Sequence, residues 1–173
     1  MQIRKAELKD FDQVMAILQD GRNQLAESGI DQWQGDYPNP DHVRQDIENG
    51  YAYLAKADDG ETVGTLTIIP APDHAYDQLD GHWQVDTNDY VTIHRVAIHS
   101  DHTGHGYASQ LYQAVINYFT RGFNDIKSVR VDTHEDNLPM QHLIEKSGFK
   151  RVGTLHGVYR ENETSYVYEL LTA

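Results

Sequence analysis

The sequence has no cysteine among its 173 residues. That absence excludes a disulfide scaffold, a thiolate metal site and a cysteine nucleophile. The chain also lacks any stretch approaching the roughly 18 apolar residues that a membrane-spanning helix needs. Because Met1 leads straight into patterned sequence without the apolar segment of a signal peptide, we expect a cytoplasmic protein with no membrane partner.

Basic residues are scarce. The chain has 14 Lys and Arg against 27 Asp and Glu, a formal net charge of −13. Binding to nucleic acid requires a basic face, so this balance argues against a DNA or RNA partner. Residues 1–90 hold 6 basic and 18 acidic residues, a net of −12, whereas residues 91–173 hold 8 and 9, a net of −1. This asymmetry indicates either two faces with different partners or acids that only aid solubility.

Short strands and amphipathic helices are predicted along the whole chain. Apolar residues alternate where we expect strands, recur at helical spacing elsewhere, and are punctuated by Gly and Pro. Strands are expected at 2–7, 51–57, 62–69, 91–98, 128–133, 149–155 and 165–171, and helices at 10–29 (capped by Asp10), 40–50, 107–119 and 138–147. This order predicts one domain over residues 1–173, of the mixed α/β (α+β) class.

The most specific local pattern spans residues 96–108. A buried strand enters a loop containing Gly104 and Gly106, and the loop opens directly into an amphipathic helix. Glycine allows a sharp turn and a close ligand, and the free N–H groups of a helix start favour an anion. The pattern predicts a phosphate or pyrophosphate site, with an ordinary strand–helix turn as the alternative. A P-loop and a dinucleotide fingerprint both fit poorly, because no Gly-Lys-Ser/Thr follows and position 109 is Ser.

A second block lies downstream and consists of Asn137 and Gly148-Phe149. Together with Ala97-Ile98 at the end of the strand, and with Gly106 and Ala108 in the loop, it resembles the pattern of the GNAT acyl-CoA N-acyltransferases. The order of elements fits that family over nearly the whole chain. The resemblance implies a mixed, mostly antiparallel central sheet with a parallel, splayed pair of strands and about four helices. It also implies acetyl-CoA as cosubstrate and a homodimer.

The resemblance assigns the CoA contacts to the loop, to the strand before it and to one asparagine. The loop amides would bind the pyrophosphate, the strand backbone would pair with the pantetheine arm, and the asparagine would contact the arm from the other side. The cofactor-binding residues so implied are Val96, Ala97, Ile98, Thr103, Gly104, His105, Gly106, Tyr107, Ala108 and Asn137.

Two positions depart from the family pattern. Thr103 stands where the loop usually has Arg or Gln, and His102 and His105 are candidates to replace that contact. Ile144 stands where many members carry a Tyr that acts as general acid for the leaving thiolate. That role is either moved, with Tyr159 and Tyr166 as candidates, or dispensed with.

Acylation needs a neutral amine, so a base must accept the amine proton, often through water. Asp132 lies where some relatives carry an acidic base, His94 lies on the strand before the loop, and His134 ends the next strand. An unperturbed imidazole titrates in a suitable range. Each has an alternative: Asp132 pairs with Arg95 or Arg130, His94 is a satisfied half-buried side chain, and His134 is a loop residue.

The irregular segments 28–40 and 70–90 contain Trp33, Tyr37 and Trp83. Such segments line the acceptor site in the family, and an aromatic, acidic surface suits an amine or ammonium. Aromatics that only cover the core under long loops are the alternative. His99, His102 and His105 recur every third residue, but they fall across a strand end and a turn without a carboxylate set, so we expect no metal.

The sequence thus predicts an N-acetyltransferase that moves the acetyl group of acetyl-CoA to a primary amine of a small molecule or peptide. Attack is expected to be direct, in a ternary complex, because no nucleophile constellation is visible. A near-neutral half for the anionic cofactor and an acidic half for a cationic amine agree with this reading. The alternatives are a non-catalytic acyl-CoA-binding regulatory module with the same fold, favoured by Ile144, and an anion-binding structural domain without CoA.

Overall fold

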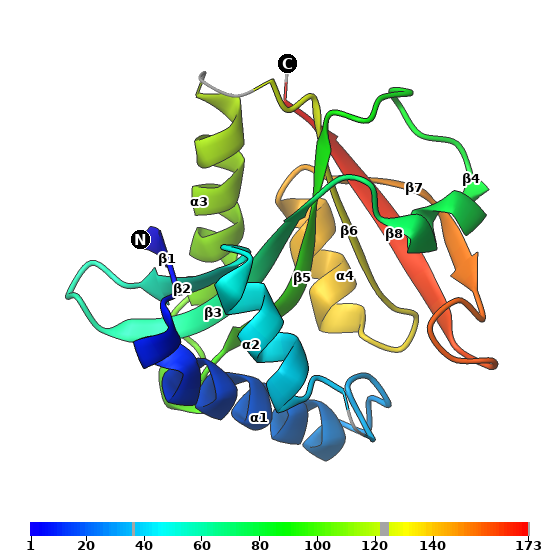
Figure 1. Cartoon of the computed structure of the whole chain (residues 1–173). Coiled ribbons are helices and arrows are strands. Elements are labelled where there is room, and N and C mark those ends of the chain that lie inside the picture. Colours follow the sequence, from blue (N-terminus) through cyan, green and yellow to red (C-terminus); the bar gives the residue numbers. More distant parts are fainter. Residues whose placement is uncertain (36, 122–124, 173) are drawn as a thin grey trace. The chain divides into compact units, whose positions relative to one another are not determined.

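The computed structural model describes residues 1–35, 37–121 and 125–172 (Figure 1). In chain order the elements are β1 (Gln2–Lys5), η1 (Leu8–Asp10), α1 (Phe11–Glu27), α2 (Pro40–Glu48), β2 (Ala52–Lys56), β3 (Thr62–Pro70), η2 (His74–Gln78), β4 (Asp80–Gly81), β5 (Tyr90–Ile98), η3 (Ser100–His102), α3 (Tyr107–Thr120), β6 (Ser128–His134), α4 (Leu138–Lys146), β7 (Lys150–His156) and β8 (Thr164–Leu171), where η marks a 3-10 turn. Among these described residues, no helix is both long and apolar enough to cross a membrane.

The described strands are hydrogen-bonded in the order β1-β2-β3-β5-β6-β8-β7-β4. The pairs β1–β2, β2–β3, β6–β8, β8–β7 and β7–β4 are antiparallel, whereas β5 and β6 run parallel from the pair Tyr90 and Ser128 to the pair Ile93 and Val131. The expected mixed, mostly antiparallel sheet with one parallel pair and four helices is confirmed. The expected single domain stays a prediction, because the residue contacts divide the chain into two compact units.

The first unit comprises Met1–Ile68 and His94–Val115. It holds β1, β2 and most of β3 as an antiparallel ladder, with α1 and α2 (Figure 1). Apolar side chains at helical spacing on α1 and α2 pack with β2 into one buried cluster. Its members are Ala6, Val14, Ile17, Leu18, Val43, Ile47, Ala52, Leu54 and Ala97.

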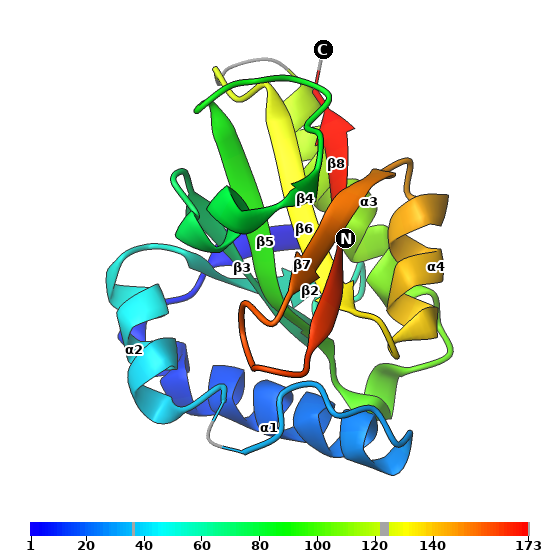
Figure 2. The same ribbon diagram turned by 90° about the vertical axis from the view of Figure 1, so that its right-hand side faces the viewer.

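The second unit comprises residues 69–93 and 116–172 of the described chain. It contains the start of β5, then β6, β8, β7 and β4, together with α4 (Figure 2). Ser128, Arg130 and Asp132 alternate along β6 and therefore share one face of the sheet. Segment 70–90 covers that face: the ring of Trp83 lies 3.7 Å from the Arg130 guanidinium carbon, and Tyr76 bonds to Asp132.

The positions of the predicted elements agree with the structure to within about two residues, and the differences have local causes. The strand expected at 2–7 ends at Lys5, because the N–H of Glu7 donates to the Asp10 carboxylate. Asp10 lies at the predicted N-cap position of α1, but the side-chain cap expected there is absent. Its carboxylate instead accepts two hydrogen bonds from Arg4, at 2.9 and 3.1 Å, and makes no side-chain cap on α1.

The sequence predicts an irregular connection over segment 70–90, but the segment also contains η2 and the short strand β4. β4 pairs with β7 through Asp80 with Thr154 and Gly81 with Gly153. A Cβ atom on Gly153 would lie 2.5 Å from the Asp80 carbonyl oxygen. Only glycine therefore permits this approach, and the pairing holds the middle of the segment on the sheet.

Candidate active site

In the first unit, β5 leads through η3 into α3 by way of the two glycines. Gly104 has φ 84° and Gly106 has φ 74°, conformations that L side chains rarely adopt. A Cβ atom built on either would meet nothing within 4 Å, so the space beside the backbone is open. The Gly106 carbonyl accepts from the Gln110 N–H, which starts the α3 ladder. By helix geometry the N–H groups of the first turn have no partner within the helix, so this exposed loop presents donors to an anion.

Helix α1 fixes the entry to this loop. The Asp20 carboxylate accepts from the backbone N–H of Ser100 at 2.8 Å and from its hydroxyl at 2.6 Å. Gln24 donates to the Ile98 carbonyl at 2.9 Å. Burial raises the pKa of Asp20, but the hydrogen bonds from Ser100 outweigh it and hold the pKa below its ordinary value. The carboxylate therefore stays ionised and keeps the start of η3 in place.

The histidines around the loop contact residues that are close to them in the sequence. His99 Nδ1 accepts from the Asp101 N–H at 3.1 Å, and the ring centroids of His102 and His105 lie 6.3 and 5.6 Å from that of Tyr107. Over residues 1–35, 37–121 and 125–172, no three His, Asp or Glu side chains gather as a metal site. These rings are instead placed beside the loop that the sequence assigns to the pyrophosphate.

Arg95 follows His94 on β5 and has φ 51°, a left-handed conformation uncommon for a residue with a side chain. Its Nε and Nη2 each donate to Asp46 at 2.8 Å, and its Nη1 donates to the Tyr37 hydroxyl at 2.6 Å. The Arg95 and Asp46 side chains are only 10% and 11% exposed. Burial lowers the pKa of Arg95, but Tyr37 and Asp46 outweigh burial and raise it above its ordinary value.

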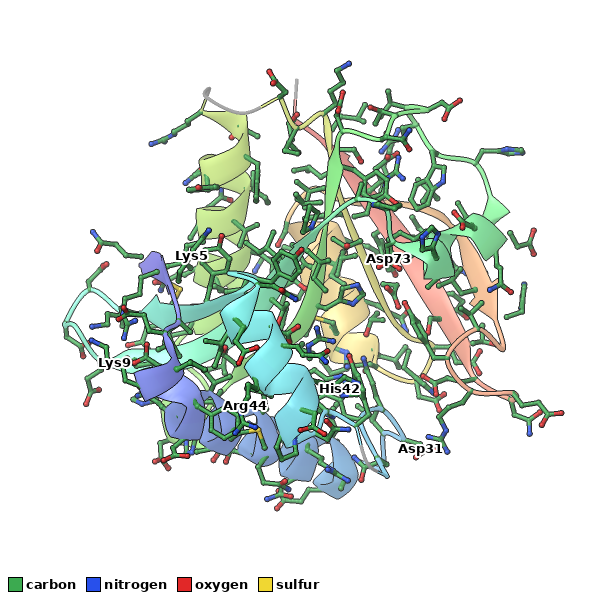
Figure 3. All side chains as sticks on the ribbon, viewed as in Figure 1. Lys5, Lys9, Asp31, His42, Arg44 and Asp73 are labelled. Atoms are coloured by element: carbon green, nitrogen blue, oxygen red, sulfur yellow. The ribbon has the colours of Figure 1, made fainter. Side chains whose placement is uncertain are left out.

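Two of the predicted acceptor residues, Tyr37 and Trp33, have different surroundings. Tyr37 is fixed by Arg95 and meets the ring of His42 edge-on, with centroids 5.3 Å apart. Figure 3 labels His42 and Arg44 on α2. Trp33 packs against the core cluster of this unit, and a Cβ atom on Gly21 would lie 3.3 Å from its ring. Trp33 thus has the core-covering contacts of the alternative reading, whereas Tyr37 is held by a polar network.

In the second unit, Asp132 accepts hydrogen bonds from two tyrosines on the same oxygen, Oδ1. Tyr76 donates at 2.7 Å and Tyr159 at 3.1 Å. Burial first, and then the Asp132 charge, raise the pKa of Tyr76 well above its ordinary value, so this phenol stays protonated. The two arginines considered as partners of Asp132 form ion pairs with other carboxylates, Arg95 with Asp46 and Arg130 with Glu169.

Arg130 lies between two rings, with its guanidinium carbon 3.7 Å from the Trp83 centroid and 3.9 Å from that of Tyr90. Its partner Glu169 is fully buried and also accepts from the Ser128 hydroxyl and the Gln84 N–H, both at 2.6 Å. The Trp83 ring therefore stacks on the Arg130 guanidinium, which the ion pair with Glu169 holds in place. A cavity of about 340 Å³ adjoins the network, with Tyr76, Asp77, Trp83, Asp86, Tyr90 and Arg130 among its lining residues.

The turn from β6 into α4 is held by two of the predicted residues. His134 is buried, and its Nδ1 accepts from the Asp136 N–H at 3.0 Å. Asn137 caps α4 by accepting from the Met140 N–H at 3.2 Å. Ile144 is fully buried on α4. The side chain at the usual acid position is therefore apolar and enclosed.

The structure groups the predicted residues within each unit. The first unit carries the loop 103–108, the strand residues Val96 to Ile98, His94, Trp33 and Tyr37, and the second carries Asp132, His134, Asn137 and Trp83. Sequence reasoning missed Tyr76 and Asp46. Both lie far along the chain from their partners, 56 and 49 residues respectively. No local pattern marks such pairs.

The sheet with its parallel pair, and the glycine loop at the start of α3, give the chain an acyltransferase-like fold. Residues 18–149 match the acetyltransferase (GNAT) family. The chain belongs to this family. No curated protein sequence matches it.

Solved structures agree with the assignment. A GNAT-family acetyltransferase from Streptococcus agalactiae is 32% identical, with a TM-score of 0.86 over 98% of this chain and 94% of that chain. A GNAT-family acetyltransferase from Listeria monocytogenes is 21% identical, with a TM-score of 0.71 over 98% and 93%. Spermidine N-acetyltransferase from Vibrio cholerae, in complex with CoA and spermine, is 15% identical, with a TM-score of 0.70 over 99% and 95%. The last two comparisons bear on the fold alone.

Proposed function

We propose that the protein transfers the acetyl group of acetyl-CoA to a primary amine of a small molecule or peptide, by direct attack in a ternary complex. The observation that carries the proposal is the loop before α3 in a chain of this family. Gly104 and Gly106 are both left-handed and both border open space, as a backbone that closely approaches a pyrophosphate requires. Acetyl-CoA supplies the activated thioester.

The proposed cofactor residues are the ten that the sequence assigns. The amides of Thr103 to Ala108 hold the pyrophosphate, and the α3 dipole adds favourable charge. The backbone of Val96 to Ile98 pairs with the pantetheine arm. Asn137, whose side-chain oxygen caps α4, contacts the arm from the other side.

Asp132 is the base that we favour. It is a carboxylate on β6 that already accepts two hydroxyl hydrogen bonds, so its position and ionisation are supported before an amine arrives. His134 is a weaker proposal, because its Nδ1 accepts a backbone N–H and protonating that atom would remove the bond. His94 remains a proposal as a half-buried imidazole on β5.

The acceptor contacts proposed are Trp33, Tyr37 and Trp83. The Tyr37 hydroxyl accepts a hydrogen bond from Arg95, and the Trp83 ring lies over Arg130. Each of these arginines is paired with a buried carboxylate. Their rings, with the acids of the first 90 residues, give surfaces that suit a cation with an apolar body.

The test combines acyl donors with acceptors. The protein is incubated with acetyl-, propionyl- or succinyl-CoA and a panel of polyamines, amino sugars, amino acids and peptide N-termini, and the products are identified by mass spectrometry. We expect one class of amine to be modified. We expect that class to receive the acetyl group in preference to the propionyl or succinyl group. A product carrying only a larger acyl group would overturn the acetyl assignment.

The buried Ile144 favours one second candidate, a non-catalytic module that binds acyl-CoA. It predicts that CoA raises the melting temperature while no amine in the panel is acylated. Thermal shift and product analysis on the same preparation separate the two.

A further inference from the structure

The two tyrosines on Asp132 differ in how firmly they are held. Tyr76 is 3% exposed, and its ring centroid lies 5.5 Å from that of Trp83. Its backbone N–H and carbonyl are both used within η2, by Asp73 and Leu79. Tyr159 is 45% exposed and makes the longer bond, 3.1 Å against 2.7 Å. One donor is therefore fixed in the core of its unit, and the other lies at the surface.

Tyr159 lies in the turn between β7 and β8, and that turn is closed at its base. The Gly157 N–H donates to the Glu163 carbonyl at 2.8 Å, and the Glu163 N–H donates to the Arg160 carbonyl at 3.0 Å. Rotation of the Tyr159 side chain can therefore move its hydroxyl away from Asp132 without opening these turn hydrogen bonds. Rotamer changes of exposed side chains are fast compared with turnover.

We propose that Tyr159 is a displaceable cover on Asp132 and that Tyr76 is its permanent positioning residue, so that an incoming amine takes the place of the Tyr159 hydrogen bond. This inference rests on the proposed role of Asp132 as base. A carboxylate that accepts two hydroxyls is held in its charged form and is a weaker base. When the N–H of the amine replaces the Tyr159 hydroxyl, Asp132 loses one of the hydroxyl donors that stabilise its charged form. This loss comes at the point when the carboxylate must accept the proton. The Tyr76 bond keeps Oδ1 in place during the exchange.

Other charged groups of the same unit lie near Asp132 and Tyr76. Arg130 and His134 are its neighbours on the same face of β6, and Arg130 is paired with Glu169. Asp73 lies close enough to Tyr76 to raise the pKa of that phenol. Val167, its register partner on β8, is apolar. None of these is altered by removing the Tyr159 hydroxyl.

The experiment compares Tyr159→Phe with the wild type, using Tyr118→Phe as the control because Tyr118 is exposed and lies on α3. The carboxyl 13C resonance of Asp132, assigned by its absence in Asp132→Asn, is titrated in each free protein. We expect Tyr159→Phe to move its titration upward by roughly half a unit to one unit. We also expect the KM for the amine to fall about three-fold, with kcat nearly unchanged. Tyr118→Phe should change neither quantity.

An unchanged titration, or a KM that rises in Tyr159→Phe, would overturn the inference, because Tyr159 would then be either remote from the carboxylate in solution or a binding residue. The variant Tyr76→Phe adds a second readout: we expect kcat to fall at least ten-fold while the amine KM changes little. An equal loss in both tyrosine variants contradicts the division of roles. If Asp132→Asn keeps full kcat while Tyr159→Phe still moves the titration, the proposed base is wrong, although the hydrogen bonds are as described.

Discussion

Two nitrogens of Arg95 donate to the two carboxylate oxygens of Asp46, each at 2.8 Å, although the residues are 49 positions apart. The pair joins α2 to β5 at the residue where β5 has a left-handed φ of 51°. Because Arg95 also donates to the Tyr37 hydroxyl, the same side chain holds Tyr37 in place. The ion pair thus organises the part of the first unit to which we assign an acceptor residue.

Replacing Asp46 should therefore destabilise the protein strongly. Asp46→Asn leaves a buried guanidinium without its counter-charge, and we expect the free energy of unfolding to fall by about 3 kcal/mol. Glu48→Gln is the matched control, because Glu48 is exposed on the same helix, and its effect should stay within about 0.5 kcal/mol. Denaturant titration measures both. Equal, small losses would show that the pair contributes little.

Gly106 provides a test of the cofactor loop. Gly106→Val places a branched side chain in the open space beside the loop and should abolish the stabilisation by CoA while the protein stays folded. Gly29→Val is the control, since Gly29 has nearly the same φ, 73°, and equally open surroundings at the end of α1. Both variants carry similar backbone strain, about 1–2 kcal/mol. Thermal shift with CoA should then persist in the Gly29 variant alone; its persistence in both would mean that the pyrophosphate binds elsewhere.

Asp10 gives the fold a predictable response to acid. Hydrogen bonds from Arg4 first, and then from the Glu7 N–H, lower the pKa of Asp10 to about 2. The folded pKa lies below that of an unfolded Asp, near 3.9. The stabilisation is therefore complete above about pH 4 and is lost as the pH falls through about 2.

Because the Arg4 side chain is 38% exposed, we expect Asp10→Asn to lower the free energy of unfolding by only about 1 kcal/mol at pH 7. The difference from the wild type should shrink steadily below pH 4 in urea unfolding experiments. A difference that is constant from pH 7 to pH 2.5 would contradict the ionic origin of this contribution.

The sequence predicts best what depends on local pattern. The strand–loop–helix at residues 91–108 was placed correctly because apolar alternation, two glycines and helical spacing are all visible within a short window. β4 was missed because Asp80-Gly81 contains no β-forming side chain. It exists because Gly153 on β7 allows the close approach.

Hydrogen-bond partners were predicted poorly, because their choice depends on the tertiary arrangement. Asp10 has the residue type of a helix cap, but a bidentate bond to Arg4 competes successfully for its carboxylate. Tyr76 reaches Asp132 from a segment without periodicity, so its partner is recognisable only once segment 70–90 lies over β6. The sequence offers Tyr159 as a candidate acid, whereas in the structure its hydroxyl donates to Asp132.

We propose that acetyl-CoA and an amine react on this protein with Asp132 as base. The most direct measurement is the initial rate of thiol release from acetyl-CoA as a function of amine concentration, for the wild type and for Asp132→Asn. We predict amine-dependent release in the wild type and a loss of kcat/KM of roughly 10²–10⁴-fold in the variant, with the CoA thermal shift retained in both. A wild type that binds CoA but releases no thiol with any amine, or a variant as fast as the wild type, would contradict it.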